Sequence, residues 1–242
     1  MLLCAAQIQP CKGNLSLNIR RHLAFIETAI SHQVEYIFFP ELSLVGYEPS
    51  LCKALALDPH NLELDDFQEI SNSHYIIIGL GLPVQNHQDV SIAMAFFQPH
   101  FPPKIYIKEY LHPDEEAFFV SGKIHDGFIG NPSTIAFGIC YEISREEHIK
   151  QVVRQNPHTY MASVAKDAAG VQAANRRLSH IAQTHMFFTG MVNSVGPSED
   201  FKSAGGSAFW NPQGELLGQL THSSEGLLIL DTDTQNCREI PL

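Results

Sequence analysis

The chain has 242 residues, of which 44% are hydrophobic, and this length and composition are typical of one folded α/β or all-β domain. Fifteen Lys and Arg against 26 Asp and Glu give a formal net charge of −11, the wrong sign for gathering phosphate backbones, so we expect no nucleic-acid partner. No apolar run approaches the ~18 residues needed to cross a bilayer, and we expect no membrane partner either.

Short apolar runs alternate with longer amphipathic ones along nearly the whole chain, which is the pattern of strands packed against helices. The first helix has the clearest pattern, because apolar residues recur at three- and four-residue steps after Asn14, a suitable N-cap. In chain order, the predicted elements are a strand (2–8), a helix (15–31), strands (36–39, 75–79, 92–97, 105–107 and 134–140), a helix (144–155), a strand (160–164), a helix (170–183), a strand (187–194) and short strands to the C-terminus. We interpret residues 1–242 as a single domain of the α/β or α+β class.

The five cysteines are odd in number and scattered, and no two of them form a C-x-x-C pair. This usage is typical of a reducing compartment rather than of a disulfide-stapled secreted domain. The N-terminal segment has no basic region and reaches polar residues too early for a signal peptide. We therefore expect a cytoplasmic protein.

Three reactive side chains follow strongly apolar strands, at positions where loops open and active sites commonly form. Glu41 comes directly after Phe38-Phe39-Pro40, Lys108 ends the run Lys104–Ile107, and Cys140 lies between a strand and a polar helix start. Such a turn places the sulfur near N–H groups that favour the thiolate. Taken singly, each also has an ordinary explanation: a solvated carboxylate, a surface lysine and a buried structural cysteine.

Other motifs do not predict a metal or a nucleotide. The 13 histidines include no H-E-x-x-H pair, so we expect no metal site. Residues 79–83 (GLGLP) lack the third glycine of a dinucleotide loop, and residues 205–209 (GGSAF) do not complete a G-x-S-x-G elbow.

Five segments, taken together and in order, resemble the nitrilase superfamily of carbon–nitrogen hydrolases. The segments are residues 39–47 (FPELSLVGY), 106–111 (YIKEYL), 115–122 (EEAFFVSG), 138–142 (GICYE) and 206–214 (GSAFWNPQG). The resemblance implies a four-layer αββα sandwich. It also implies pairing of subunits, and a charged fraction of only 17% agrees with surface covered by another subunit, so we expect a homodimer or higher homo-oligomer.

By this resemblance Glu41, Lys108 and Cys140 form a catalytic triad, with Glu115 as a second carboxylate beside it. Cys140 attacks an amide carbonyl after Glu41 takes its proton, and a thioester forms. The Lys108 ammonium and the backbone N–H of Tyr141 stabilise the oxyanion, while Glu115 orients Lys108. Tyr47 and Tyr141 are the predicted substrate-binding residues, and no cofactor is needed. The expected activity is that of an amidase on a small, non-peptide amide.

Several alternatives stay open at this level. A nitrilase or an N-carbamoyl hydrolase would use the same triad, and a catalytically idle binding subunit would keep the same fold. The segment after Cys140 lacks the family's usual Phe-Pro, and residues 162–166 end in Lys166 where Asn is more usual, so the substrate, the pathway and the role of Glu142 are not predicted. Lys166 either faces a substrate carboxylate or is a solvated loop lysine, the commoner case.

Overall fold

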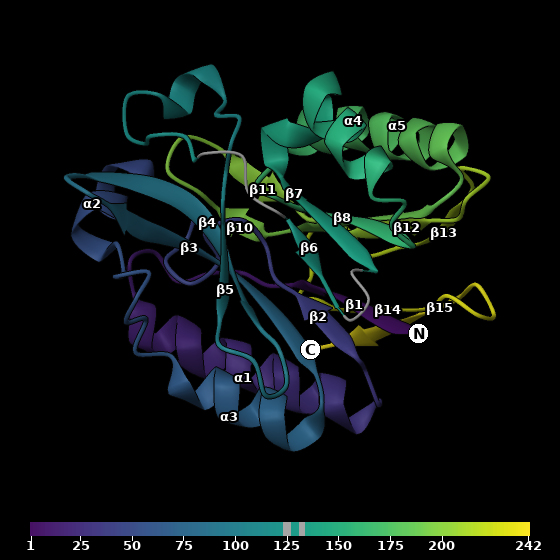
Figure 1. Cartoon of the computed structure of the whole chain (residues 1–242), viewed down its shortest axis with the longest axis horizontal. Helices are drawn as coiled ribbons and strands as arrows, with labels where there is room; N and C mark the ends of the chain where they lie inside the picture. The colour runs from purple at the N-terminus through teal and green to yellow at the C-terminus, as the bar shows by residue number, and fades with distance from the viewer. Residues whose placement is uncertain (123–126, 131–133) are drawn as a thin grey trace.

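Two β-sheets face each other in the middle of the molecule, and helices cover their outer faces (Figure 1). This computed structural model describes residues 1–122, 127–130 and 134–242. Helices α1 (Leu15–Ser31) and α3 (Asp65–His74) lie outside one sheet, while α4 (Glu146–Arg154) and α5 (Ala168–His185) lie outside the other. The expected αββα arrangement is confirmed.

The first sheet has seven strands within the described residues, and its centre is parallel. In spatial order they are β15 (Asn236–Pro241), β14 (Gly226–Asp231), β1 (Leu2–Gln7), β2 (Tyr36–Phe38), β3 (Ile77–Asn86), β4 (Asp89–Phe97) and β5 (Lys104–Ile107). Because β1, β2 and β3 run in parallel, their carboxyl ends lie at one edge of the sheet.

The second sheet has six strands in the part of the chain that the structure describes, and its centre is also parallel. In spatial order they are β13 (Leu216–Gln219), β12 (Ala208–Trp210), β9 (Phe188–Asn193), β8 (Thr159–Val164), β7 (Ile135–Ile139) and β6 (Phe128–Ile129). A small hairpin of β10 (Val195–Pro197) and β11 (Lys202–Ala204) follows β9.

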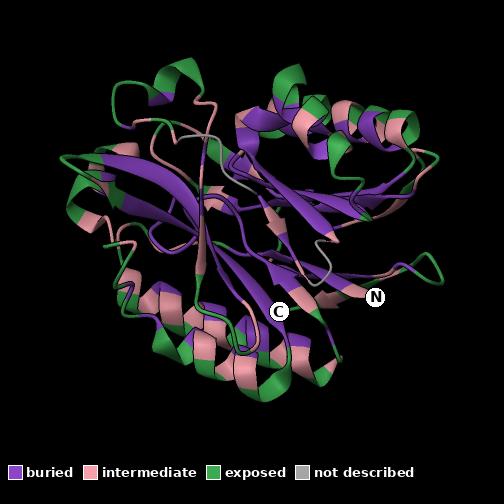
Figure 2. Cartoon of the chain, viewed as in Figure 1, coloured by how far each residue is buried: buried purple, intermediate pink, exposed green. Residues whose placement is uncertain are grey.

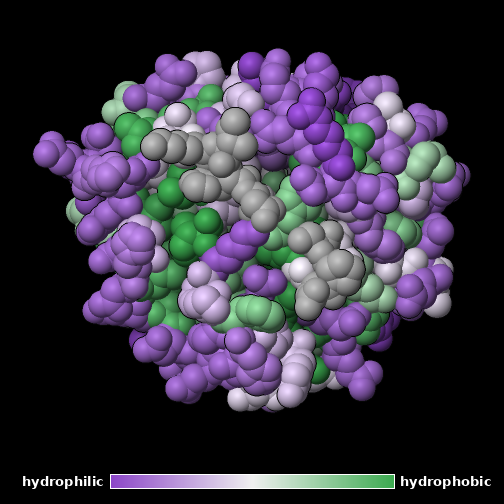
Figure 3. Space-filling view, in the orientation of Figure 1, coloured by the Kyte–Doolittle hydropathy of each residue, from purple (hydrophilic) through white to green (hydrophobic). Residues whose placement is uncertain are grey.

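Both sheets are buried on both faces, which explains the continuous apolar runs of the central strands. In β2, Ile37 belongs to the cluster under α1 and α3, whereas Phe38 points to the other sheet and its ring lies 5.4 Å from that of Phe137. The buried strands lie between outer helices that expose one face to solvent (Figure 2). On the face seen in Figure 3, hydrophilic side chains dominate the periphery and hydrophobic ones gather toward the middle.

The helix predicted for residues 15–31 is confirmed, and the Asn14 side chain accepts a hydrogen bond from the Leu17 N–H at 3.1 Å. The strand predicted for residues 75–79 has the wrong bounds, because β3 begins at Ile77 and runs through Pro83 to Asn86. Pro83 is tolerated since β2 pairs with β3 only as far as Gly79, so its missing N–H removes no bond to β2. Two helices were not predicted, α2 (Pro49–Leu55) and α3.

The chain around Cys140 also differs from the prediction. Strand β7 ends at Ile139, a 3₁₀ turn η2 covers Cys140–Ser144, and α4 begins at Glu146 rather than at residue 144. The predicted abrupt change from strand to helix is present, with a tight turn inserted between them.

Across the described ranges, the structure contains no helix whose length and hydropathy would let it cross a lipid bilayer.

Candidate active site

Glu41 lies in a turn that follows β2 and rests on β3. Phe39 N–H donates to the Gly79 carbonyl at 2.9 Å, and Leu44 N–H donates to the Gly81 carbonyl at 3.0 Å. Gly81 also passes so close to the turn that a Cβ on it would lie 2.2 Å from the Pro40 carbonyl oxygen. A side chain at position 81 would therefore push Glu41 out of place.

A buried polar network holds the same turn from the side of α1. Asn18 donates its side-chain amide to the Leu44 carbonyl at 2.9 Å, and His22 Nε2 lies 2.9 Å from Ser43 Oγ. His22 Nδ1 lies 2.7 Å from the Asn18 carbonyl, which can only accept, so Nδ1 carries the proton and Nε2 accepts from Ser43. Burial lowers the pKa of His22 to about 4, which keeps the ring neutral in this role.

Lys108 lies between two carboxylates, as the resemblance implied. Its Nζ is 2.7 Å from Glu41 Oε1 and 2.7 Å from Glu115 Oε1, and the Lys108 and Glu41 side chains are fully buried. Burial alone would lower the pKa of Lys108, but the charges of Glu41 and Glu115 outweigh burial and raise it. Lys108 therefore stays an ammonium at neutral pH.

The two carboxylates are held differently. Glu115, in the 3₁₀ turn η1 (Pro113–Glu115), accepts from the Tyr47 hydroxyl at 2.9 Å and from the His112 N–H at 2.8 Å, so both of its oxygens are bonded. Glu41 uses only Oε1, because its buried Oε2 has no hydrogen-bond partner among the described residues. Glu41 thus has one oxygen without a partner, whereas both oxygens of Glu115 are already hydrogen-bonded.

Cys140 begins the η2 turn with a φ of +45°, a left-handed conformation that is uncommon for a residue with a Cβ. Burial has the largest effect on its thiol and raises the pKa; the positive charges of Lys166 and Lys108 oppose this, and the carboxylate of Glu41 adds to it. The net effect is a raised pKa, in contrast to the favoured thiolate expected from the helix start. A protonated thiol needs a base before it can act as a nucleophile. Glu41, whose charge acts on the Cys140 thiol, has an oxygen without a hydrogen-bond partner.

Glu142, whose role the sequence did not predict, links the segment that contains Lys108 to the segment that contains Cys140. Its Oε2 accepts from the Tyr106 hydroxyl and from the Ile139 N–H, both at 2.7 Å, and its Oε1 accepts from the Glu109 N–H at 2.7 Å. The side chain is fully buried. It therefore links the backbone beside Lys108 to the backbone beside Cys140 and does not face the cavity described below.

Replacing Glu142 with Gln should lower both the free energy of unfolding and kcat. The Gln side chain has an NH₂ group where Glu142 has an accepting oxygen, so at least one of the three buried donors loses its acceptor, which typically costs about 1–3 kcal/mol. Urea denaturation and steady-state kinetics measure the two effects. Glu147→Gln, an exposed change on α4, is the matched control. Full stability and activity in Glu142→Gln would show that the link is dispensable.

A cavity of about 420 Å³ gives access to Cys140. It is bounded by residues from loops at one end of both sheets. Its lining includes Tyr47, Pro49, His112, Asp114, Glu115, Phe118, Cys140, Ala165, Lys166, Asp167, Gly170, Glu199, Asp200 and Phe201. Tyr47 thus lies where a substrate-binding residue was expected, and its role in binding stays a prediction.

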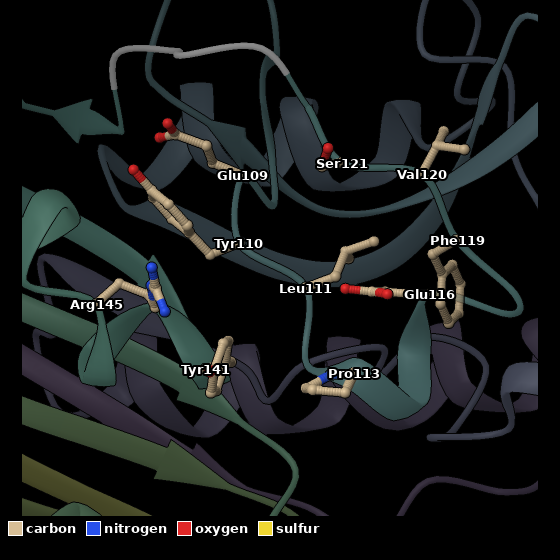
Figure 4. A pocket seen from close by; sticks show the side chains of 10 residues that line it. All are labelled: Glu109, Tyr110, Leu111, Pro113, Glu116, Phe119, Val120, Ser121, Tyr141 and Arg145. Carbon is tan, nitrogen blue, oxygen red and sulfur yellow. The ribbon is translucent and has the colours of Figure 1, made fainter.

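The Tyr141 side chain lies elsewhere. It lines a second pocket of about 540 Å³, together with Tyr110, Arg145 and residues of the segment from Leu111 to Ser121 (Figure 4). There the Arg145 guanidinium lies 5.4 Å from the centre of the Tyr110 ring and 5.9 Å from that of Tyr141. The predicted contribution of Tyr141 to substrate binding therefore depends on its backbone N–H, not on its ring.

Potential metal ligands are not gathered in the part of the chain that the structure describes: no group of three or more His, Cys, Asp or Glu side chains has the geometry to hold an ion. The buried histidines have other contacts, His22 with Ser43 and His148 with Tyr160 at 3.1 Å.

Comparison with known proteins agrees with this geometry. The family model of carbon–nitrogen hydrolases matches residues 2–242. The chain belongs to the carbon–nitrogen hydrolase family. Membership confirms the resemblance to the nitrilase superfamily, and it supports hydrolysis of carbon–nitrogen bonds as the class of reaction.

Curated relatives of this carbon–nitrogen hydrolase include two glutamine-dependent NAD(+) synthetases. The one from Aquifex aeolicus is 25% identical over 243 residues, which cover 96% of this chain and 42% of the relative. The one from Acinetobacter baylyi is 25% identical over 251 residues, which cover 96% of this chain and 44% of the relative. The chain spans less than half the length of either relative.

Solved structures show the same fold. An amidase from Nesterenkonia sp. AN1 matches with a TM-score of 0.86 and 20% identity, covering 96% of this chain and 92% of that one. The glutamine-dependent NAD+ synthetase from Acinetobacter baumannii matches with a TM-score of 0.81 and 22% identity, covering 100% of this chain and 47% of that one. One structure of the Nesterenkonia amidase carries an acetamide moiety covalently bound at its active-site cysteine.

Proposed function

We propose that this carbon–nitrogen hydrolase is an amidase that releases ammonia or an amine from a small amide through a thioester on Cys140. The observation that carries the proposal is the buried Lys108 ammonium, held at 2.7 Å by both Glu41 and Glu115 while Glu41 Oε2 remains without a partner. A nucleophile, a base to activate it and a donor for the oxyanion can together carry out acyl transfer from nitrogen.

In the first half of the proposed reaction, Glu41 Oε2 takes the thiol proton and Cys140 Sγ bonds to the amide carbon. The Lys108 ammonium and the Tyr141 N–H donate to the resulting oxyanion. The carbon–nitrogen bond then breaks, and the departing nitrogen takes the proton from Glu41. Ammonia or an amine leaves, and the acyl group remains on Cys140 as a thioester.

In the second half, water hydrolyses the thioester. Glu41 takes a proton from the water, whose oxygen bonds to the acyl carbon. The carbon–sulfur bond breaks, Cys140 regains the proton from Glu41, and a carboxylic acid is released. Glu115 serves throughout by holding the ammonium of Lys108 in place.

The experiment is a substrate panel of aliphatic, aromatic, ω-amido and carbamoyl compounds and nitriles, with detection of ammonia and of the carboxylate product. Hydroxylamine converts an accumulated thioester into a hydroxamate, which mass spectrometry identifies. We expect amides to be the best substrates. Nitriles or carbamoyl compounds as the best substrates would replace the amidase with one of the related activities, and no turnover of any compound would favour a binding subunit.

A second candidate is hydrolysis of glutamine, with the ammonia used by another protein or segment. It is favoured by the two synthetases, whose names describe glutamine dependence and of which this chain matches less than half. Glutamine belongs to the same panel, and a kcat/KM for glutamine far above those of simple aliphatic amides would select this candidate.

The activity should fall as the pH is lowered through about neutrality. Burial has the largest effect on Glu41 and raises its pKa to about 7, with Lys108 opposing and Glu115 adding to the rise. Protonated Glu41 cannot accept the thiol proton, so the acid limb of kcat/KM should lie near this value rather than near the ordinary ~4.3 of a glutamate.

Glu115→Gln is the matched variant for this profile, because it removes the charge that raises the pKa of Glu41. Its acid limb should move to lower pH. A wild-type limb at the ordinary value of a glutamate would show that burial does not raise the pKa of the base.

A further inference from the structure

Lys166 is a cation at the Cys140 cavity that the proposed reaction does not use. It follows β8, and its backbone is clamped from two sides. The Lys166 N–H donates to Asn193 Oδ1 at 3.0 Å, and the Lys166 carbonyl accepts from Asn193 Nδ2 at 3.0 Å and from the Ala204 N–H at 2.9 Å. Asn193 is itself fully buried and donates to the Gly205 carbonyl at 2.9 Å. The position of Lys166 is therefore set by the core.

The side chain of Lys166 is half-buried in the cavity lining beside Cys140. Two other lysines have carboxylate partners: Lys108 pairs with Glu41 and Glu115, and Lys12 pairs with Glu48 at 2.7 Å. Among the described residues, no ion pair within 4 Å neutralises Lys166. An unpaired, partly desolvated ammonium in a cavity is an anion-binding group.

The carboxylates at the cavity mouth form no ion pair with Lys166 among the described residues. Asp167 caps α5 by accepting from the Gly170 N–H at 2.7 Å, and Glu199 accepts from the Ser50 N–H at 2.9 Å. Asp114 and Asp200 are exposed. The cavity therefore presents one cation beside the nucleophile and negative charge at its entrance.

We propose that Lys166 is a specificity-determining residue that binds a carboxylate of the substrate, so that the substrate class is a short ω-amide with a carboxylate at its other end. The inference rests on the proposed amidase function and adds the recognition element to it. Lys166 and Cys140 line the same cavity of about 420 Å³, so a carboxylate bound to Lys166 would lie within a short molecule's length of the carbon that Cys140 attacks. An ammonium on the same molecule would face the acidic mouth.

The test compares matched substrates in the wild type and in Lys166→Met, which keeps most of the side-chain length and removes the charge. The pairs are succinamate with butyramide and glutaramate with pentanamide; asparagine and glutamine add the ammonium. The readout is the ratio of kcat/KM within a pair, so that any general effect on activity cancels. We expect the wild type to favour the carboxylate by about ten- to hundred-fold, mainly through KM, and Lys166→Met to lose that preference.

Two controls sharpen the comparison. Lys166→Arg keeps the charge and should keep part of the preference, while Lys202→Met, an exposed change on β11, should leave both substrates unaffected. A wild type without preference would overturn the proposal. An equal loss for both members of a pair in Lys166→Met would also overturn it, because Lys166 would then act on the Cys140 thiol and not on the substrate carboxylate.

Binding separates this proposal from the proposed function. Calorimetry with Cys140→Ala measures the affinity for glutaramate without turnover. If the wild type hydrolyses no amide yet glutaramate binds and Lys166→Met abolishes that binding, the carboxylate site stands and the amidase fails. If glutaramate binds equally with and without Lys166, or does not bind at all, the carboxylate site is refuted whatever the activity.

Discussion

Replacing Cys140 with Ala should abolish ammonia release from the best substrate while leaving the protein folded. The change removes the atom that forms the thioester, and we expect kcat to fall by at least about 10⁴-fold. Cys140 is buried at the start of the η2 turn and has a φ of +45°. Alanine also has a Cβ, so the substitution adds no backbone strain at this position. The loss of one sulfur atom should therefore change the free energy of unfolding by no more than about 1–2 kcal/mol. Ammonia assay and urea denaturation measure the two quantities.

Cys52→Ala is the matched control, since Cys52 is also buried but lies on α2. It should keep kcat. Cys140→Ser should be nearly as inactive as Cys140→Ala, because a hydroxyl is far harder to deprotonate than a thiol. Sustained hydrolysis by Cys140→Ala would refute the thioester mechanism.

Replacing Lys108 with Ala should reduce kcat by more than the loss of a single oxyanion donor, which is typically about 10²–10³-fold. Removing the ammonium leaves Glu41 and Glu115, both within 2.7 Å of the missing nitrogen, as close carboxylates without a cation between them. One of them then holds a proton at neutral pH, so Glu41 loses much of its capacity as a base. Single-turnover kinetics with hydroxylamine should detect no trapped thioester.

Breaking a buried ion pair also destabilises a protein, commonly by about 3–5 kcal/mol, so the loss of activity needs a folded control. Lys108→Met with Glu115→Gln removes one cation and one anion together and should recover most of the stability without recovering activity. Lys53→Ala, an exposed change on α2, should affect neither. A Lys108→Ala enzyme that retained more than about a tenth of its kcat would exclude Lys108 from the reaction.

The pattern of apolar runs predicted a domain of the α/β or α+β class, and the resemblance to the family predicted the αββα layers and the residues of the site. Buried parallel strands give continuous apolar runs in the sequence, and reactive side chains at the ends of such runs can be identified from the sequence alone. Glu41, Lys108 and Cys140 stand at such positions, whereas Glu115 was predicted only from the resemblance to the family. Helix α3 was not predicted, because only Phe67 and Ser71 are buried on it and its short apolar stripe carries little periodicity.

The hydrogen bonds that hold those residues, and the position of Lys166 at the cavity, depend on the tertiary structure. The links from Glu142 to Tyr106, from His22 to Ser43 and from Asn193 to the Lys166 backbone join residues 21 to 36 positions apart. A hydrogen bond between distant residues leaves no periodic signal, because it depends on how the two sheets pack and not on local spacing. For the same reason Lys166 is an ordinary loop lysine in the sequence, and only the packing of β8 against β9 places its ammonium at the wall of the Cys140 cavity.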